Sequence, residues 1–181
     1  MEEAAGGSRE AFDGLVRRYQ AQIVNLARAM TSSDADVEDL AQETFVRAWR
    51  AIATFRWQSS FKTWLYGIAI NVIRTERSRR ARRRLMFWTA SKGARPAPDP
   101  LERASADDGI EAPLAMRDAI DRALATLPAE MREAIVLRDV HGLDYREIAE
   151  ALRVPVGTIE SRIFRARQRL RPLLESLRSS R

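Results

Sequence analysis

Residues 156–171 place hydroxyl and guanidinium groups on one side of a helical pattern. At 3.6 residues per turn, this side carries Thr158, Ser161, Arg162, Arg165 and Arg169, and the opposite side carries Val156, Ile159, Ile163, Ala166 and Leu170. Guanidinium and hydroxyl groups donate hydrogen bonds to anionic oxygens and to other acceptors. The pattern therefore predicts a helix that buries its apolar side and turns its basic side to an anionic partner, although a solvated surface helix shows the same pattern.

The residues before this stretch indicate a second helix joined to it by a short turn. Asp144 and Glu147 have the three-residue spacing of a capping box, so a helix is expected to begin at Asp144 and to end by Arg153. Gly142 stands where a left-handed cap would end the helix before it, and Pro155 suits the first turn of the helix after it. This order of elements predicts a helix-turn-helix arrangement.

A helix of this kind fits the major groove of B-DNA, where the outer residues near its N-terminus approach base edges. The candidate base readers are Thr158, Glu160, Ser161, Arg162 and Arg165, and the later Arg167, Arg169 and Arg171 are placed to hold phosphates. Glu160 is the unusual member, because a carboxylate is repelled by phosphates but accepts a hydrogen bond from cytosine N4. Two interpretations of Glu160 stay open: it reads a cytosine, or it orients a neighbouring arginine.

The residue inventory excludes most catalytic chemistry. The chain has no cysteine and a single histidine, His141, so the sequence offers no disulfide, thiolate nucleophile or ordinary zinc site. No serine or tyrosine stands in an activating setting, and no carboxylates cluster as metal ligands. We therefore expect neither an enzyme nor a cofactor. No apolar run approaches the roughly 20 residues of a membrane span, and no signal-peptide pattern is present, so the expected location is the cytoplasm.

The 181 residues carry a formal charge of +6, and almost all the positive charge is arginine. Position is more informative than the total, since genomes rich in G and C also encode arginine frequently. Residues 74–84 hold seven arginines and one acid, whereas residues 93–112 hold five acids and two arginines. The helical pattern stops over residues 89–113, where proline, glycine and serine are frequent. This segment is predicted to be a linker, either a solvated spacer or a segment that follows a groove of a larger partner.

Apolar residues recur at helical spacing on both sides of the linker, and no segment alternates with the two-residue period of a strand. Three helices are expected within residues 12–72, and further helices within residues 114–174. The fold class is predicted to be all-α, with two small helical domains joined by a flexible linker. We expect the first domain at 8–84, the linker at 85–112 and the second domain at 113–178.

Three segments together resemble the bacterial extracytoplasmic-function sigma factors. They are DVEDLAQETFVRAWRAI at 36–52, FRWQSSFKTWLYGIAINVIR at 55–74 and VGTIESRIFRARQRLR at 156–171, in the order and at about the separation typical of that family. The resemblance covers nearly the whole chain outside the linker. It implies two helical domains, called regions two and four, that bind core RNA polymerase and direct it to the −10 and −35 elements of promoters.

The resemblance assigns a polymerase-binding surface to region two. Asp39, Gln42 and Glu43 correspond to the part that docks on the clamp coiled coil of the polymerase β′ subunit. Asp39 and Glu43 are four residues apart, so they share one helical face and form an acidic pair. Without the resemblance, two solvated carboxylates would be the ordinary interpretation. A separate anti-sigma protein is a common further partner in this family, but no residue of the sequence identifies where one would dock.

The resemblance also assigns residues to the −10 element. They are Phe55, Arg56, Trp57, Ser59, Lys62, Asn71 and Arg74, from the specificity loop and the helix after it. An aromatic loop beside arginines suits a single-stranded base that is flipped out of the duplex, so Phe55 and Trp57 are expected to stack on such a base. The spacing of Trp64 instead favours a place in the core.

Two positions differ from better-known relatives. Primary sigma factors carry adjacent tryptophans that help to open the duplex, and this chain has Gly67 and Ile68 there, as smaller relatives do. Melting is therefore expected to depend on the loop and on a favourable promoter, which would make the promoter range narrow. Glu160 stands where well-known relatives have a basic residue, so the preferred −35 sequence stays open.

Two other functions account for part of the sequence. A regulator that binds operators through its C-terminal helix pair would explain residues 113–175, but not an acidic patch followed by an aromatic and basic loop. A nucleic-acid enzyme such as a recombinase would need the nucleophile or the metal ligands that the inventory excludes. The sigma-factor interpretation accounts for both halves of the chain.

Overall fold

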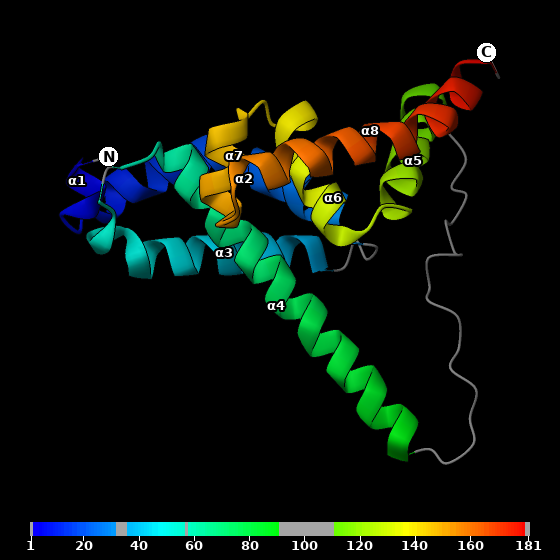
Figure 1. Ribbon diagram of the computed structural model, residues 1–181. Helices are drawn as coiled ribbons and strands as arrows, with labels where there is room; N and C mark the ends of the chain where they lie inside the picture. Colours follow the sequence, from blue (N-terminus) through cyan, green and yellow to red (C-terminus); the bar gives the residue numbers. More distant parts are fainter. Residues whose placement is uncertain (1, 32–35, 57, 91–110, 180–181) are drawn as a thin grey trace.

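The computed structural model describes residues 2–31, 36–56, 58–90 and 111–179. Within these residues the elements are helices and turns without a strand, so the predicted all-α class is confirmed (Figure 1). In chain order they are α1 (Glu2–Ala5), α2 (Arg9–Met30), α3 (Val37–Ala51), the 3-10 turn η2 (Ile52–Thr54), α4 (Phe61–Ala90), α5 (Glu111–Ala125), α6 (Ala129–Ile135), the π-helical turn η4 (Val136–Val140), α7 (Tyr145–Leu152) and α8 (Val156–Ser179). Helices α1–α4 form an N-terminal domain, and α5–α8 form a C-terminal domain.

The N-terminal domain packs α2, α3 and the first half of α4 against one another. α2 begins after Ser8, whose Oγ accepts a hydrogen bond from the Ala11 amide, and α4 begins after Ser60, whose Oγ accepts one from the Thr63 amide. Asp36 takes the N-cap position of α3 without a side-chain cap bond. The side chains buried between these helices include Ile23, Leu26, Phe45, Leu65 and Ile70.

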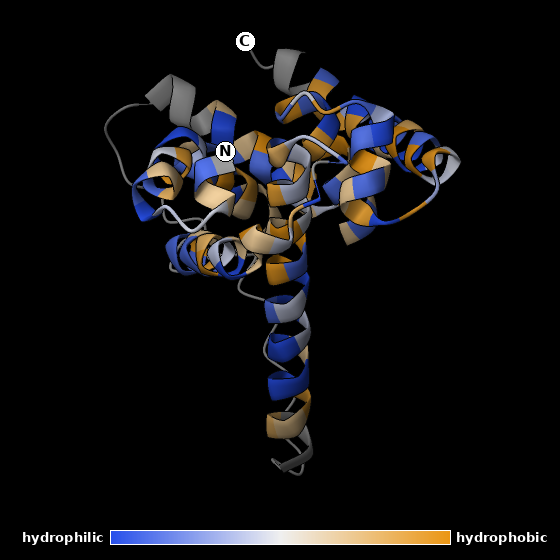
Figure 2. Cartoon of the chain, turned by 90° about the vertical axis from the view of Figure 1, so that its left-hand side faces the viewer, coloured by the Kyte–Doolittle hydropathy of each residue, from blue (hydrophilic) through white to orange (hydrophobic). Residues whose placement is uncertain are grey.

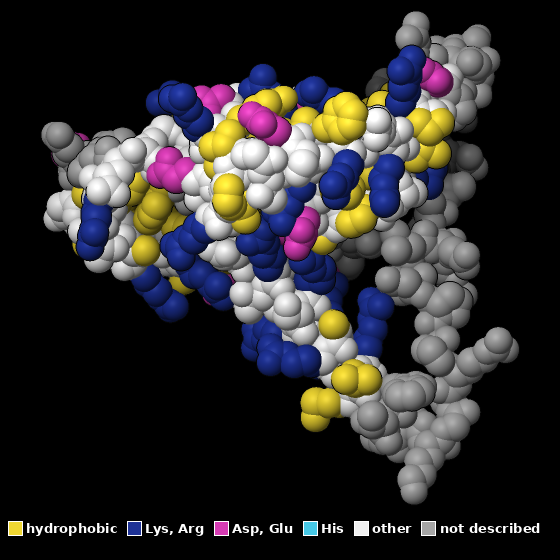
Figure 3. All heavy atoms as spheres, viewed as in Figure 1, with side chains coloured by type: hydrophobic (Ala, Val, Ile, Leu, Met, Phe, Trp, Pro, Cys, Tyr) yellow, Lys and Arg dark blue, Asp and Glu magenta, His cyan; other side chains and the backbone are white. Residues whose placement is uncertain are grey.

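α4 is long enough to contact helices of both domains with its first half and to extend beyond them with its second half. Its first half is packed among the other helices, whereas its second half projects from the body as a single helix (Figures 1 and 2). The projecting part carries the arginine run, with exposed Leu85, Met86 and Phe87 beyond it (Figure 3). Residues 85–90, which the sequence analysis placed in the linker, are helical. Across the described residues, no helix combines the length and the apolar character needed to cross a membrane.

The C-terminal domain contains the helix-turn-helix arrangement that the sequence predicts. The capping box is present, since Asp144 Oδ1 accepts from the Glu147 amide and Glu147 Oε2 accepts from the Asp144 amide, both at 2.8 Å. Gly142 has φ +69°, the left-handed conformation expected of it. Arg153 is also left-handed, with φ 56°, and it ends α7. The turn then leads directly into α8.

The two domains are in contact along the first half of α4. α7 lies against this part of α4, and α2 contacts α5, α6 and η4. We call the residues that meet here the interdomain interface: Lys62, Thr63, Tyr66, Gly67 and Arg74 of α4, with Glu133, His141, Glu147 and Ala151 of the C-terminal domain. The fold therefore brings part of the predicted −10 surface next to the C-terminal domain.

Candidate promoter and polymerase interfaces

α8 presents a polar face over a buried apolar stripe. Four of the predicted stripe residues are buried, namely Ile159, Ile163, Ala166 and Leu170. Val156 is exposed instead, because it opens the helix at the turn and lies outside the packed stripe. The predicted readers Glu160, Ser161 and Arg165 and the predicted phosphate contacts Arg169 and Arg171 are exposed, and Thr158 is half-buried. The exposed residues share one side of α8 and are accessible to a DNA duplex.

Three arginines of α8 bind carboxylates of their own domain, namely Arg162, Arg171 and Arg167, whose Nη2 donates to Asp139 Oδ1 at 2.7 Å. Arg162 Nη2 lies 2.5 Å from Glu130 Oε2 of α6, and the Arg162 side chain is 16% exposed. Arg162 therefore joins α8 to α6 and does not lie on the outer face, where the sequence placed it. Helical spacing could not reveal this, because Glu130 stands 32 residues earlier. Arg171 Nε donates to Glu175 Oε1 at 2.9 Å, and this hydrogen bond raises the pKa of the exposed Arg171 guanidinium.

Phe164 is a surface residue that the sequence analysis missed. Its ring is 63% exposed on α8, next to Arg165. The signal was present in the spacing, because position 164 follows Ile163 directly and so cannot share the buried stripe. A ring exposed on a helix of this kind can make apolar contact with the methyl group of thymine. Phe164 therefore joins the candidate readers.

α3 carries the three residues that the resemblance assigns to the polymerase. Asp39 and Gln42 are exposed, and the half-buried Glu43 accepts a hydrogen bond from Arg47 Nε at 2.7 Å. Asp39 and Glu43 border a cavity of about 380 Å³ between α3 and α4, whereas Gln42 borders a separate groove between α2 and α3. The three side chains therefore lie on the solvent-facing side of α3, which we call its outer ridge. Asp39 and Glu43 form an acidic pair on the flank next to α4, and Gln42 lies on the flank next to α2.

The groove between α2 and α3 has a volume of about 770 Å³. It is lined by Arg9, Phe12, Asp13, Val16, Gln20, Val24, Glu38, Ala41, Gln42, Phe45, Val46 and Trp49. Phe12 and Trp49 pack against each other, with ring centroids 5.0 Å apart. An apolar groove with polar side chains along it is suited to an amphipathic helix. Periodicity along a single helix does not reveal this groove, because it arises only when α2 and α3 lie side by side.

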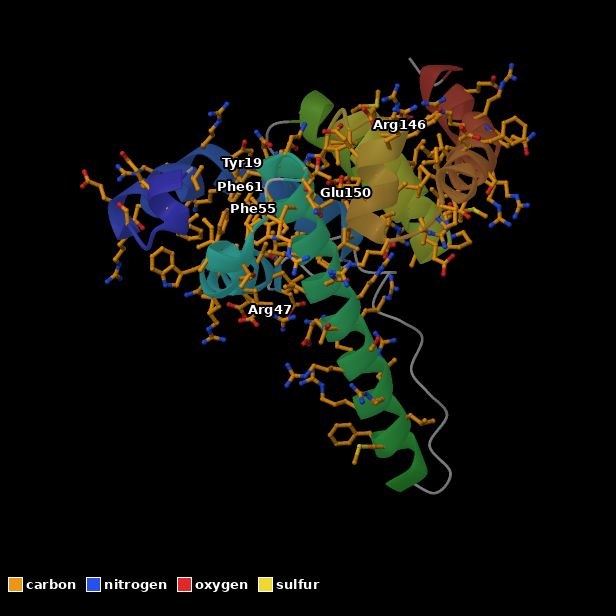
Figure 4. All side chains as sticks on the ribbon, turned by 60° about the vertical axis from the view of Figure 1, so that its left-hand side comes forward. Tyr19, Arg47, Phe55, Phe61, Arg146 and Glu150 are labelled. Atoms are coloured by element: carbon orange, nitrogen blue, oxygen red, sulfur yellow. The ribbon has the colours of Figure 1, made fainter. Side chains whose placement is uncertain are left out.

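The loop before α4 departs from its expected form at Phe55. The Phe55 ring is 8% exposed, and its centroid lies 5.1 Å from that of Trp64 and 6.4 Å from that of Phe61. Figure 4 shows Phe55, Phe61 and Tyr19 close together at the start of α4. A ring packed in this way has little surface for a base, so the stacking role predicted for Phe55 does not fit this structure. Trp64 is half-buried in the same aromatic cluster, as its spacing predicts.

The other predicted −10 residues fall into an accessible group and an engaged group. Arg56 and Asn71 are exposed, Ser59 is half-buried, and Trp57 lies outside the described residues. The engaged group is Lys62 and Arg74, which both bind the C-terminal domain. Lys62 Nζ donates to the His141 carbonyl oxygen at 2.7 Å, and Arg74 donates to both carboxylate oxygens of Glu133. The hydrogen bond with Glu133 raises the pKa of Arg74, so the guanidinium keeps its positive charge in this contact.

His141 has a structural place in the interdomain interface. Its Nδ1 lies 2.8 Å from the Tyr66 hydroxyl, which is also 3.1 Å from Gln22 Oε1. Burial, together with the nearby charge of Lys62, lowers the pKa of His141 to about 4, so the ring is neutral at pH 7. In the part of the chain that the structure describes, no three histidine or carboxylate side chains are grouped as metal ligands.

Two family models match the chain. Sigma-70 region 2 matches residues 15–83, and Sigma-70, region 4 matches residues 117–170. The RNA polymerase sigma-H factor of Pseudomonas aeruginosa is 36% identical, over 98% of this chain and 93% of its own. The ECF RNA polymerase sigma-E factor of Escherichia coli (strain K12) is also 36% identical, over 93% of this chain and 88% of its own.

Two solved structures are similar over most of the chain. CnrH in complex with the cytosolic domain of CnrY has a TM-score of 0.70 at 28% identity, over 97% of this chain and 94% of that one. The sigma factor RpoE in complex with the anti-sigma factor NepR from Bartonella quintana has a TM-score of 0.75 at 29% identity, over 92% and 98%. With region 2 on α2–α4, region 4 on α5–α8 and relatives that match along its length, the chain belongs to the extracytoplasmic-function (ECF) sigma factors.

Proposed function

We propose that this sigma factor recognises a −35 and a −10 promoter element and helps to open the duplex at −10. Sigma factors direct promoter-specific initiation of transcription, and one observation carries the finer proposal. α8 follows the capped α7 across a short turn and holds Glu160, Ser161 and Arg165 exposed above a buried stripe. This is the arrangement of a recognition helix that enters the major groove of DNA.

At the −35 element, the exposed face of α8 reads bases with its first half and holds phosphates with its second. Arg165 can donate two hydrogen bonds to guanine, and Ser161 can bond to more than one base. Phe164 adds an apolar contact for thymine. Arg169 and Arg171 lie further along the helix, where contacts to phosphates position the protein without reading sequence.

At the −10 element, the proposed contacts come from the loop before α4 and from α4 itself. Arg56 and Asn71 are accessible to DNA, and Trp57 is our candidate for stacking on a flipped base. Phe55 supports this loop from the aromatic cluster and does not stack. Lys62 and Arg74 can hold DNA phosphates once they leave the C-terminal domain.

Polymerase binding is assigned to the outer ridge of α3, where Asp39, Gln42 and Glu43 lie between two hollows of the surface. Core polymerase performs the chemistry, so the factor itself needs no catalytic residue. Because both similar structures are complexes, one of them with a protein named as an anti-sigma factor, we also propose that an anti-sigma protein binds this chain. We expect the sigma factor itself to act in the cytoplasm, where polymerase and promoters are.

Transcription in vitro tests the function as a whole. Core polymerase is supplied with the protein and a library of promoters, and the transcribed members are sequenced. We expect transcripts only when the protein is present, from templates that share two short elements about the same distance apart. Transcription that does not depend on the protein, or templates with no shared element, would refute the proposal.

A charge reversal tests the polymerase surface. Asp39→Arg with Glu43→Arg should weaken capture of the factor by core polymerase, because both acidic contacts are reversed. Asp118→Arg is the matched control, since Asp118 is an exposed acid of α5, outside α3. Circular dichroism should show unchanged helix content in both variants. Equal capture of the wild type and of the double variant would remove α3 as the docking surface.

Glu160 is tested by selecting binding sites from a randomised −35 library. A carboxylate that accepts from cytosine N4 should lose this preference in Glu160→Arg, and guanine should replace it, with discrimination of about 1–3 kcal/mol at that base pair. If Glu160 instead orients a neighbouring arginine, the same variant should weaken selection at the position that this arginine reads. An identical consensus from the wild type and the variant would show that Glu160 has no part in reading DNA.

A further inference from the structure

We infer that the interdomain interface is an autoinhibitory contact, in which the C-terminal domain occupies the side of α4 that binds −10 DNA. Lys62 and Arg74, both predicted at the −10 element, bind the C-terminal domain in this structure. The free protein therefore keeps the Lys62 and Arg74 part of its −10 surface closed until polymerase or promoter DNA separates the domains. The inference rests on the proposed function for the identity of the DNA partner, whereas the contact itself is independent of it.

The strongest part of the contact joins Arg74 to Glu133. Arg74 Nε and Nη2 donate to Glu133 Oε1 and Oε2 at 3.1 and 2.5 Å, which is the paired geometry that a guanidinium also forms with phosphate. Arg77 Nη1 lies 3.8 Å from the same carboxylate. Glu133 is 2% exposed, so its charge depends on these arginines for compensation. Glu133 thus takes the position in which Arg74 would hold a DNA phosphate.

A second group of bonds continues the contact through the first turns of α4. Lys62 Nζ donates to the His141 carbonyl oxygen at 2.7 Å, and Thr63 Oγ1 donates to Glu147 Oε1 at 3.1 Å. Tyr66 is fully buried, and its hydroxyl lies 2.8 Å from His141 Nδ1. Lys62, Thr63 and Tyr66 therefore each have a hydrogen-bond partner in the C-terminal domain.

Gly67 determines how closely the domains approach. A Cβ atom at this position would lie 3.1 Å from the Ala151 carbonyl oxygen and 3.5 Å from Ala151 Cα. α7 can lie this close to α4 because position 67 has no side chain. The sequence resemblance aligns Gly67 and Ile68 with the tryptophans that help primary sigma factors to open DNA. The same glycine therefore removes a duplex-opening side chain and permits the closed contact.

The −35 surface is outside this contact. Ser161, Phe164 and Arg165 are exposed on α8, and the buried stripe of α8 packs within the C-terminal domain. DNA at the −10 element and the C-terminal domain compete for Lys62 and Arg74, whereas Ser161, Phe164 and Arg165 take no part in the interdomain interface. The closed form is thus expected to inhibit −10 binding selectively.

Distance measurements on the full-length protein test the closed contact. The chain has no native cysteine, so cysteines introduced at the exposed positions Ala53 and Arg146 can carry one spin label in each domain. Pulsed electron paramagnetic resonance should give one narrow distance distribution. Glu133→Gln removes the buried charge and Gly67→Leu places a side chain against α7, so each should broaden and lengthen the distribution. Asp139→Asn is the matched control, because this acid pairs with an arginine of its own domain.

Binding of a fluorescent single-stranded −10 oligonucleotide tests inhibition. If closed molecules outnumber open ones by about tenfold, full opening raises the apparent affinity by about tenfold. Glu133→Gln and Gly67→Leu should therefore bind the oligonucleotide more tightly than the wild type, and Asp139→Asn should bind as the wild type does. Circular dichroism confirms that each variant is folded.

The outcomes separate the inference from the proposed function. A broad distribution in the wild type, or a narrow one that neither variant changes, would overturn the closed contact while leaving promoter recognition intact. Domains that separate in the variants without tighter oligonucleotide binding would overturn inhibition. Absence of protein-dependent transcription in the reconstituted assay would instead count against the proposed function, whatever the distances show.

Discussion

The two surfaces proposed to face the promoter differ in what their arginines bind. On α4, Arg74 is paired with the buried Glu133 of the other domain, whereas on α8 Arg165 and Arg169 are exposed. Both surfaces are helical and basic, so composition does not distinguish them. The difference teaches that an arginine is withheld from DNA where the fold has paired it with a buried carboxylate of another domain.

One short helix supplies the carboxylates on both sides. Glu130 of α6 binds Arg162 of α8, and Glu133 of α6 binds Arg74 of α4. The first pair holds α8 within its own domain, and the second joins that domain to the predicted −10 surface. α6 therefore engages one arginine of each surface in a structural ion pair.

The largest effect is expected from a cavity in the core beneath α8, because it would destabilise the domain that carries one of the two compared surfaces. Ile163→Ala deletes a buried side chain and should lower the free energy of unfolding by about 2–5 kcal/mol. Since the C-terminal domain supplies half of the interdomain interface, the distance between spin labels should broaden as well. Urea denaturation measures the first effect. Val156→Ala is the control, because its exposed side chain should change the free energy by no more than about 0.5 kcal/mol; equal losses would mean that the stripe is not the core.

The next effect weakens the closed contact through pH. The pKa of His141 is lowered from 6.5 to about 4, so the closed form binds fewer protons than a form in which His141 is hydrated. The contribution of neutral His141 to the stability of the closed contact is therefore fully present above about pH 6.5, and it is lost as the pH falls toward 4. Lys62 adds positive charge nearby, and Tyr66 and Gln22 are the other polar groups of α4 and α2 at this point.

The measurement for this prediction is the spin-label distance between pH 7.5 and 5. The distribution should broaden as the pH falls, before helix content changes. His141→Gln keeps a polar side chain but does not titrate, so it should flatten the pH dependence of the distance. The same broadening in the wild type and in His141→Gln would assign the pH effect to other groups.

A smaller effect sharpens the comparison by separating the two surfaces. Arg165→Ala should lose about 1–3 kcal/mol of discrimination at one −35 base pair, because a paired hydrogen bond to guanine is lost. Arg74→Ala should leave binding to a −35 duplex unchanged, since Arg74 lies on the other surface. Fluorescence anisotropy with matched and mismatched −35 duplexes measures both. Weaker −35 binding in Arg74→Ala would show that the two surfaces are not independent.

The smallest effect distinguishes holding DNA from reading it. Arg171→Ala should weaken binding to all −35 duplexes alike and reduce the slope of log affinity against log salt by about one. Arg122→Ala, an exposed arginine of α5, should change neither quantity and serves as the control. A change in base preference at Arg171 would mean that it reads bases.

Local sequence signals predicted the helices and the helix-turn-helix correctly. Asp144, Glu147 and Gly142 adopt the predicted cap geometries, because each cap closes its bonds within a few residues of itself. Ile163 and Leu170 are buried as their spacing predicts. Val156 failed the same rule, since periodicity does not show where a packed stripe ends at a turn.

Side chains that respond to distant residues could not be predicted in this way. Phe55 was expected to stack on a base, but its ring joins an aromatic cluster with Phe61 and Trp64. Arg162 was expected on the outer face of α8, but Glu130 pairs with it from 32 residues away. Spacing along one helix does not reveal these partners, because the packing of the elements determines which side chains meet.

The sequence by itself determined the helices, their caps, the buried side of α8 and membership of the family, since these depend on periodicity, on contacts within a turn and on matching segments. Only the tertiary structure decided which basic residues are accessible. Arg74 and Glu133 are 59 positions apart, and they meet because the C-terminal domain packs against α4, where Gly67 leaves room for α7. A charge pattern states what a side chain can bind, but the packing of the domains determines what it does bind.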